Sequence, residues 1–473
     1  MMQSTVKNLG GLLDRVVEEA PERAALVIGE QTITFGQLGA GIASTANALA
    51  DMGVGVGDRV MVVDECSTLF LSAVLGAARI GAAAAPMNHR LTAGELRELH
   101  AASGCDRAIA GDGFVGLVGD ALGRSPLTPA IALRWGGDAP TPVGVDADDT
   151  ALVLFTSGTT GLPKAVALSH GDLVPRVALF SATFDPAAEP VRALCCVPAV
   201  HVGGLVGLLV ALAAGSTSVI QSRFDAGEWL ALVERHRIQR TFLVPAMLRR
   251  ILDPPDFTNA DLSSLRTLAY GAAPAGPDLI RRAVEAMPDV DFSNVYGQTE
   301  TLGAVTMLSP ADHRDPTRVG SVGRVLPGIE WRLAETGEFQ VHQQGDWHGT
   351  GDLARVDDDG YVWVEGRLAD TINRGGEKLG PIEVEEALRK HPAVVDVAVA
   401  GIPDEELGER VGAAVVIDGG VAPADLVAFC RQHLAPWKAP ERIAVVDEIP
   451  YTELGKVSRP QIAALITEHG ATP

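Results

Sequence analysis

Cysteine is scarce in this chain, and the few cysteines present do not suggest a metal or disulfide framework. Among 473 residues there are five, namely Cys66, Cys105, Cys195, Cys196 and Cys430. They form no CxxC pair, and an odd count with one adjacent pair is a poor basis for disulfides. This usage fits a reducing compartment, so we expect a cytoplasmic protein.

Basic residues are also in deficit. The chain has 38 Lys and Arg against 60 Asp and Glu, which gives a formal charge of −22 and a pI near 4.9. An acidic surface does not attract nucleic acid or anionic membranes, which argues against both as general partners. A polyanionic ligand must therefore be bound by a local group of hydrogen-bond donors that are positioned for it.

Segments that would direct the chain to or across a membrane are not evident. The first helical segment carries four acidic side chains between positions 14 and 22, unlike the basic and then apolar order of a secretory signal. One run, residues 193–215, has no formal charge, but it contains Pro198, His201 and several glycines. We therefore expect a buried strand, a loop and a helix there and not a membrane span.

The length and the apolar pattern predict at least two domains, one of them large and layered. Helical periodicity near Thr34 is followed by short buried strands that alternate with helices, a pattern typical of largely parallel α/β sheets. These strands are expected at residues 59–63, 107–110, 151–154, 217–220, 241–244 and 265–270. Short strands rich in glycine between about 320 and 364 predict a small β-rich subdomain, and a compact α+β unit follows residue 366.

A glycine- and hydroxyl-rich loop, residues 155–164, follows the apolar run at 151–154 and ends in Lys164. Glycines let backbone N–H groups approach an anion, hydroxyls add donors, and lysine supplies a charge, so a triphosphate is the natural guest. The spacing fails the Walker pattern, because Leu162 and Pro163 separate the glycine from the lysine. Alone, such a loop is more often a surface turn.

Other polar motifs follow in a defined order. They are Tyr296-Gly297-Gln298-Thr299-Glu300, Thr350-Gly351-Asp352, Gly366-Arg367, Asn373-Arg374-Gly375-Gly376-Glu377-Lys378 and Gly455-Lys456. The carboxylate of Glu300 could hold Mg²⁺ through its oxygens. Each motif alone is more often a turn or a surface ion pair. Their joint occurrence, in this order and at these separations, says more than any one of them.

With these motifs, and with Gly271-Ala272-Ala273-Pro274 between them, the chain resembles the adenylate-forming superfamily of acyl-CoA synthetases, peptide adenylation domains and firefly luciferase. It is most similar to an acyl-CoA ligase, over essentially its whole length. The resemblance implies an α/β fold with a large N-terminal domain (1–366) of layered, mostly parallel sheets and a small β-rich subdomain. It also implies a hinge at 367–369 and a small, mobile α+β C-terminal domain (370–473) that carries a catalytic lysine.

The resemblance implies ATP and Mg²⁺ as cofactors, with CoA as co-substrate. Catalytic roles would belong to Lys456, Glu300, His201 and Thr156, and the metal would lie at Glu300 and Thr156. Residues expected to contact ATP are Thr156, Ser157, Gly158, Thr159, Thr160, Lys164, Gly271, Ala272, Ala273, Tyr296, Gly297, Thr299, Asp352, Arg367 and Lys456. Asp352 would accept the ribose hydroxyls, Tyr296 would lie beside adenine, and Lys456 would stabilise charge on the transferring phosphoryl group.

His201 matches the family segment beside the acyl carbonyl, although a lone histidine in an apolar run is more often a core residue. The expected acyl pocket has small and apolar walls: His201, Gly203, Gly204, Leu205, Gly303 and Ala304. Peptide-type relatives usually carry an aspartate in this segment, and none lies between Leu194 and Asp225. An apolar monocarboxylic acid, whether fatty, alicyclic or aromatic, is therefore the expected substrate.

For transfer to a thiol, the resemblance places Gly375 and Gly376 beside the pantetheine arm and Lys378 near the CoA phosphates. A tight turn explains the two glycines equally well. The sequence departs from the family in the short segment 335–348, and at Ala369, where relatives commonly carry a polar pivot residue.

Three alternatives stay open. The enzyme could release acyl-AMP, it could pass the acyl group to a carrier-protein phosphopantetheine or a partner enzyme, or the chain could be a degenerate regulator that binds nucleotide or acyl ligand. A homodimer is also possible.

Overall fold

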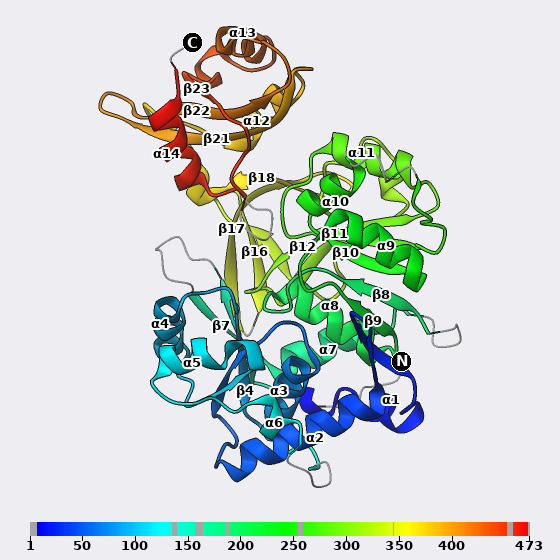
Figure 1. Cartoon of the computed structure of the whole chain (residues 1–473). Coiled ribbons are helices and arrows are strands. Elements are labelled where there is room, and N and C mark those ends of the chain that lie inside the picture. Colours follow the sequence, from blue (N-terminus) through cyan, green and yellow to red (C-terminus); the bar gives the residue numbers. More distant parts are fainter. Residues whose placement is uncertain are drawn as a thin grey trace.

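A computed structural model describes residues 7–134, 140–156, 164–184, 190–253, 257, 259–343, 345–451 and 457–471. A large N-terminal body carries a smaller C-terminal unit, at the top of Figure 1. Three sheets are formed by the described residues, two in the body and one in the smaller unit. The expected α/β class, with a large and a small domain, is confirmed.

The first sheet of the body has five strands and is parallel except at one edge. In sheet order they are β5 (Arg107–Ala110), β3 (Arg59–Val63), β4 (Ala83–Met87), β6 (Thr150–Thr156) and β7 (Lys164–Ser169). Successive side chains of a strand point to opposite faces. Val60 and Val62 accordingly enter the core between the sheets, whereas Met61 and Val63 pack with α4 (Ala93–Ser103) and α5 (Val115–Leu122) on the outer face.

The second sheet has 13 strands, and at β12 its pairing changes from parallel to antiparallel. In sheet order they are β15 (Trp331–Leu333), β16 (Glu338–Gln343), β17 (Asp346–Val356), β18 (Tyr361–Arg367), β14 (Gly323–Val325), β13 (Gly303–Leu308), β12 (Asp291–Gln298), β11 (Thr267–Gly271), β10 (Arg240–Leu243), β8 (Arg192–Cys195), β9 (Thr217–Ile220), β1 (Ala24–Ile28) and β2 (Gln31–Thr34). From β12 to β1 neighbouring strands are parallel, and the remaining pairs are antiparallel. The parallel strands in the middle of the sheet are therefore flanked by antiparallel strands on both sides.

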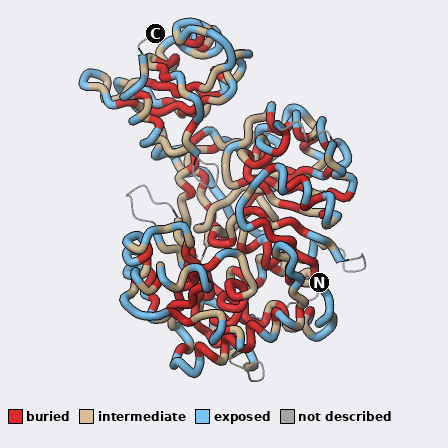
Figure 2. The backbone as a smooth tube through the Cα atoms, in the orientation of Figure 1, coloured by how far each residue is buried: buried red, intermediate tan, exposed pale blue. Residues whose placement is uncertain are grey.

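Helices fill the space between the two sheets and cover their outer faces. The central layer is built from α2 (Phe35–Asp51), α3 (Thr68–Arg79), α7 (His170–Ser181) and α8 (Val202–Ala213), with the short α1 (Asp14–Glu19) and α6 (Pro129–Ala132) beside it. On the far face of the second sheet lie α9 (Ala226–His236), α10 (Pro245–Leu252) and α11 (Pro277–Ala286). Figure 2 shows the buried backbone concentrated in these layers.

The uncharged run at 193–215 folds as predicted, with strand β8, a loop and helix α8. Within the part of the chain that the structure describes, every helix is too short or too polar to cross a lipid bilayer.

The strands expected as a small β-rich subdomain are present as β14 to β18, and they have their own apolar cluster around Phe339, Val341 and Val362. They do not form an isolated sheet, because β14 pairs with β13 and thereby joins the large sheet. Long-range pairing of this kind leaves no mark in the local sequence pattern.

The C-terminal unit is a small α+β domain. Its strands are β19 (Ile372–Arg374), β20 (Glu377–Leu379), β21 (Val394–Asp404), β22 (Gly408–Ile417) and β23 (Arg442–Val445). One face packs against α12 (Pro381–Arg389) and α13 (Pro423–His433), and the other against α14 (Arg459–His469). The compact α+β unit expected after residue 366 is therefore found.

Candidate active site

The candidate phosphate loop connects two antiparallel strands. Strand β6 ends at Thr156 and β7 begins at Lys164, and these two residues are paired across the strands. The loop therefore begins and ends at one point, at the edge of the first sheet. Lys164 is exposed. The predicted phosphate contacts at Ser157, Gly158, Thr159 and Thr160 lie outside the described residues.

Thr156 and Glu300, predicted to hold a metal ion together, are in direct contact. The Oγ1 of Thr156 donates to the Oε1 of Glu300 at 3.0 Å, and the bond joins the first sheet to the turn between β12 and β13. The described residues contain no group of three or more His, Cys, Asp or Glu side chains able to hold a metal. Mg²⁺, however, is usually bound through one or two carboxylates together with substrate phosphates. The Thr156 hydroxyl beside the Glu300 carboxylate fits Mg²⁺ binding of this kind.

Asp352 is the centre of a second polar cluster. Its side chain is 7% exposed. Its Oδ2 accepts from the Tyr296 hydroxyl at 2.7 Å and from the Gln298 amide at 2.8 Å, and its Oδ1 accepts from Arg367 Nε at 3.0 Å. A carboxylate has about four acceptor positions. One further hydroxyl can therefore be accepted without displacing these donors, which fits the predicted ribose contact.

The sequence motif did not identify Gln298 as a site residue. Its Nε2 donates both to Asp352 and to the Thr350 carbonyl, the latter at 2.7 Å. The signal was available, because Tyr296, Gln298 and Glu300 alternate in one motif. On β12 this alternation places Tyr296 and Gln298 on one side.

Backbone geometry is unusual in the segments expected to hold adenine. A Cβ on Gly271 would lie 2.1 Å from the Val295 carbonyl oxygen, so close pairing of β11 with β12 requires glycine there. Ala272 has a φ of 66°, which is rare for a residue with a side chain. Residues held in such conformations cluster at functional sites. Ala273 follows and is half-buried.

Glycine is also required at Gly297, where a Cβ would lie 1.8 Å from the Gly303 carbonyl oxygen. Tyr296, beside it, packs edge-on to Phe339. Burial raises the pKa of the Tyr296 hydroxyl, and the charge of Asp352 raises it further. The hydroxyl therefore stays protonated as a donor. Thr299 lies in the turn that follows, where its carbonyl accepts from Leu302 N–H at 3.0 Å.

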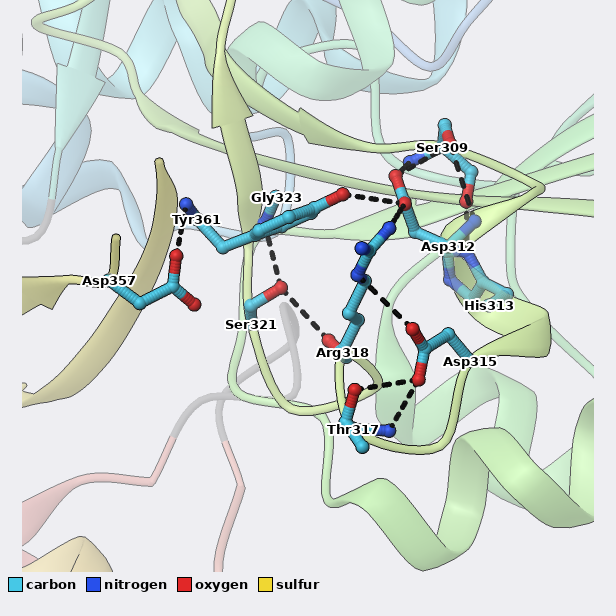
Figure 3. A network of polar contacts seen from close by, with 10 residues as sticks. All are labelled: Ser309, Asp312, His313, Asp315, Thr317, Arg318, Ser321, Gly323, Asp357 and Tyr361. Atoms are coloured by element: carbon cyan, nitrogen blue, oxygen red, sulfur yellow. Dashed lines mark hydrogen bonds and ion pairs between the residues drawn. The ribbon is translucent and has the colours of Figure 1, made fainter. Parts of the chain in front are cut away.

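A polar network connects Tyr270 of β11 with the loop after β13 and with β18. Tyr270, the residue before Gly271, bonds His313 at 3.0 Å. His313 Nδ1 lies 2.7 Å from the Ser309 carbonyl, so Nδ1 carries the proton and Nε2 accepts from Tyr270. Figure 3 shows His313 and Ser309 beside Asp312, whose carboxylate is bonded by Arg318 and Tyr361. The network ties the loop after β13 to β18.

The two segments expected to form the acyl pocket meet at the start of helix α8. A Cβ on Gly303 would lie 3.9 Å from Val202, the first residue of α8. His201 is the N-cap residue of that helix and is half-buried. A Cβ on Gly203 would lie 3.4 Å from the Phe242 ring, so an aromatic side chain forms part of this wall. The geometry places an apolar surface beside His201.

Other residues of this set have structural explanations that need no ligand. A Cβ on Gly204 would lie 2.3 Å from the Pro198 carbonyl oxygen, so glycine is required for the tight start of α8. Leu205 is fully buried in the core between the two sheets. Ala304 is held by a residue that the motifs did not reveal: Arg176 of α7 donates to its carbonyl at 2.8 Å. Burial lowers the pKa of that arginine.

The C-terminal candidates are only partly described. Gly375 and Gly376 have φ of 60° and 95° and form the two-residue turn between β19 and β20. Such turns need φ above zero at both positions, so the turn alone explains the glycines. Lys378 on β20 is exposed, and Lys456 lies outside the described residues. Ala369 lies in a short 3₁₀ helix, Leu368–Asp370, directly after β18.

Comparisons with known proteins agree with this arrangement. Residues 13–353 match the family of AMP-binding enzymes, and residues 383–456 match the C-terminal domain of AMP-binding enzymes. The chain is 34% identical to a feruloyl-CoA synthase of an Amycolatopsis species, covering 96% of this chain and 98% of that one. It is 32% identical to the fatty acid–[acyl-carrier-protein] ligase ScoC of Streptomyces coeruleorubidus, with 94% of each chain covered.

Among solved structures, the chain is similar to the o-succinylbenzoate CoA synthetase of Bacillus subtilis in complex with its acyl-adenylate. The TM-score is 0.84 at 28% identity, and the match covers 95% of this chain and 97% of that one. The family resemblance expected from the motifs is thereby confirmed. The two domain matches together span most of the sequence, and this chain belongs to the family of AMP-binding enzymes.

Proposed function

We propose that the protein is an AMP-forming acid–thiol ligase that activates an apolar monocarboxylic acid with ATP and transfers the acyl group to CoA. One observation carries the proposal. The segment 296–300 contacts both polar clusters, because Tyr296 and Gln298 donate to Asp352 and Glu300 accepts from Thr156. A single nucleotide lying along this segment would have its ribose at Asp352 and its phosphates at Thr156.

In the first step, an oxygen of the carboxylate bonds to the α-phosphorus of ATP, and the bond to the bridging oxygen breaks, so that pyrophosphate leaves. Both reactants are anions, and like charge must be neutralised where they meet. Lys164 and Lys456 would supply fixed positive charge. Thr156 and Glu300 would hold Mg²⁺, which when bound supplies Lewis-acid stabilisation of the phosphate oxygens.

In the second step, the thiol sulfur bonds to the acyl carbon, the bond from that carbon to AMP breaks, and the thiol proton passes to solvent. The turn at Gly375 and Gly376 would line the path of the thiol arm, with Lys378 near the phosphates of CoA. Rotation about the segment 367–369 would exchange Lys456 for this turn between the steps.

The nature of the acid follows from the wall beside His201. Gly203 faces the ring of Phe242, and the neighbouring positions Gly303 and Ala304 carry little or no side chain. No carboxylate in this segment is available to hold an ammonium group. We therefore propose a substrate with an apolar body, whether aromatic, alicyclic or fatty. The similarity to a feruloyl-CoA synthase favours aromatic acids as the first to be tested.

The test is mass spectrometry of products from the purified enzyme with ATP, Mg²⁺ and a panel of aromatic, alicyclic and straight-chain acids, with and without CoA. Acyl-CoA from a subset of acids is the expected result. Acyl-AMP that accumulates unchanged in the presence of CoA would contradict the proposed acceptor.

A carrier protein is the second candidate acceptor, and the 32% identity to an acyl-carrier-protein ligase favours including it. A phosphopantetheinylated carrier protein belongs in the same assay, with acylation read from its intact mass. A homodimer and a cytoplasmic location are also proposed. Sedimentation tests the first and cell fractionation the second, and the five free cysteines are compatible with a reducing compartment.

A further inference from the structure

The glycine turn at residues 375–376 is weakly held by its own strands. Strands β19 and β20 have three residues each, and β19 meets the rest of its sheet through one residue pair, Arg374 with Gly408. A hairpin this short is marginal by itself. Its position must therefore be set by contacts to the surrounding domain.

A chain of four charged side chains supplies such contacts. Arg374, the residue before the turn, donates from Nε to Glu441 Oε1 at 2.6 Å. Glu441 lies directly before β23 and accepts from Arg410 of β22 with its other oxygen, and Arg410 also bonds Asp404 at the end of β21. The turn is thereby connected to three longer strands of the domain through one carboxylate.

The charges of this group balance only when Glu441 is present. Two guanidinium groups, Arg374 and Arg410, meet at its two oxygens, and Asp404 forms its ion pair with Arg410. The four side chains are between 19% and 35% exposed, so the pairs are partly shielded from solvent. Without the Glu441 carboxylate, two like charges would face each other across a gap, and Arg374 would lose its ion pair.

Two hydrogen bonds from backbone N–H groups complete the attachment. Gly375 N–H donates to the Leu407 carbonyl at 2.7 Å, and Asn373 N–H donates to Glu409 Oε2 at 2.7 Å. Leu407 lies in the turn between β21 and β22 and Glu409 lies at the start of β22, so both bonds lead to the same end of the β21–β22 hairpin as Asp404. A shift of Arg374 away from Glu441 would therefore change the angle of the glycine turn and would leave its attachment at Leu407 in place.

We propose that Glu441 is a positioning residue for transfer of the acyl group to the thiol. It holds Arg374, and through Arg374 it fixes the turn at Gly375 and Gly376 that would line the path of the thiol arm. The inference rests on the proposed function, in which this turn serves the second step and Lys456 serves the first. Adenylation should therefore be insensitive to Glu441.

The experiment measures the two half-reactions separately in Glu441→Gln. Pyrophosphate release from ATP and acid without thiol should stay within about twofold of wild type. Formation of acyl-CoA from supplied acyl-AMP should fall about 10-fold, since misplacement by about 1 Å can cost up to 10²-fold. Glu441→Asp, which keeps the charge, should recover part of the loss. The matched control is Glu405→Gln, an exposed glutamate in the β21–β22 turn.

Arg374→Gln cuts the same link from the other side and should show the same division, which keeps the test available if Glu441→Gln fails to fold. An equal fall in both half-reactions, or no fall in thioester formation, would overturn the proposal. Wild-type enzyme that makes acyl-AMP but no acyl-CoA is a different failure: it overturns the proposed acceptor and is seen before any variant is made.

Discussion

Thr156 and Glu300 are 144 positions apart in the sequence, and a hydrogen bond of 3.0 Å joins their side chains. Thr156 ends a strand of the first sheet, and Glu300 follows a strand of the second. The bond therefore joins the two sheets at one point. A site at this point contains side chains from both sheets, which suits a reaction between two bound molecules.

Glu300→Gln should lower the rate of acyl-AMP formation by about 10²-fold. The amide lacks the charge that holds Mg²⁺, and a bound metal ion contributes several kcal/mol of charge stabilisation, at about 1.4 kcal/mol for each factor of ten. Pyrophosphate release measures the effect. The apparent KM for Mg²⁺ should rise as well.

The matched control is Glu285→Gln, in helix α11 on the far face of the second sheet. This variant should keep wild-type activity and melting temperature. A Glu300→Gln enzyme with full activity at low Mg²⁺ would show that the metal is held elsewhere.

Tyr296→Phe should raise the KM for ATP by about 5- to 10-fold with little change in kcat. The variant removes the 2.7 Å bond to Asp352, and a hydrogen bond to a charged group contributes about 1.5–3 kcal/mol. Part of that energy is recovered because Gln298 and Arg367 still hold the carboxylate. Initial rates over a range of ATP concentrations measure the effect.

Tyr361→Phe is the control, because its hydroxyl also bonds an aspartate at 2.7 Å, namely Asp312, which does not belong to the Asp352 cluster. We expect it to lower the melting temperature and to leave the KM for ATP unchanged. Equal effects of both variants on that KM would argue against a nucleotide role for Tyr296.

Asp312 should make the protein less stable in acid. Burial opposes its ionisation, but bonds from Ser309, Tyr361 and Arg318 lower its pKa from 3.8 to about 2. A lowered pKa gives stability that is complete above the ordinary value and is lost as pH falls through the folded value. The contribution is about 2 kcal/mol at 1.36 kcal/mol for each pKa unit, and it should disappear between about pH 4 and pH 2.

Thermal melting of Asp312→Asn across this range tests the point. Figure 3 shows the three donors that the amide would no longer match. The variant should melt lower than wild type at neutral pH and converge with it near pH 2. Asp358→Asn, an exposed neighbour of this network, should follow the wild-type curve.

His170 should make the stability of the protein depend on pH near neutrality as well. Its fully buried ring accepts the Leu9 N–H at Nδ1 over 3.0 Å, so it must be neutral. Burial lowers its pKa, and the charge of Asp149 opposes this only in part. Its stabilising effect is complete above about pH 6.5 and is lost as pH falls through the lower, folded pKa.

Melting temperatures from pH 8 to pH 5 should show this decline in wild type and a flatter profile in His170→Asn. Exposed His433→Asn should keep the wild-type profile. Parallel profiles for His170→Asn and wild type would contradict the assignment.

Arg459→Leu should destabilise the C-terminal domain by about 3–5 kcal/mol, because it leaves Glu385 as a buried charge that has lost its main partner. The Glu385 side chain is 5% exposed, and Arg459 bonds both this carboxylate and the Val399 carbonyl. Urea unfolding measures the loss. The double variant Glu385→Leu/Arg459→Leu should recover part of it, since the buried Glu385 carboxylate is then removed together with its main partner.

The parts of the fold that follow from local pattern were predictable from the sequence. The run at 193–215 has strand periodicity, then Pro198, then helix periodicity, and it folds in that order. The joining of β14 to β13 was not predictable, because it depends on which distant edge is free to accept hydrogen bonds. Local propensity carries no information about such a choice.

The candidate site was predictable to the extent that its residues belong to motifs. The contact of Thr156 with Glu300 brings together two of these motifs. Gln298 was missed although it stands inside one, since a pattern of residue types does not say which side chains bond each other. Arg176 was missed for a different reason: it acts through the Ala304 carbonyl from a helix with no motif of its own.

The order of strands in the large sheet also bears on how the chain is made. Strand β1 is synthesised early, but its parallel neighbour is β9, and Leu26 pairs with Ser218. At about 5–20 residues per second, translation needs roughly 10–40 s to deliver that partner. During this interval Ala25 and Leu26, fully buried in the finished protein, have only the neighbouring strand β2 to pair with. The side chains of β1 therefore stay without most of their sheet until more than half of the large body has been synthesised.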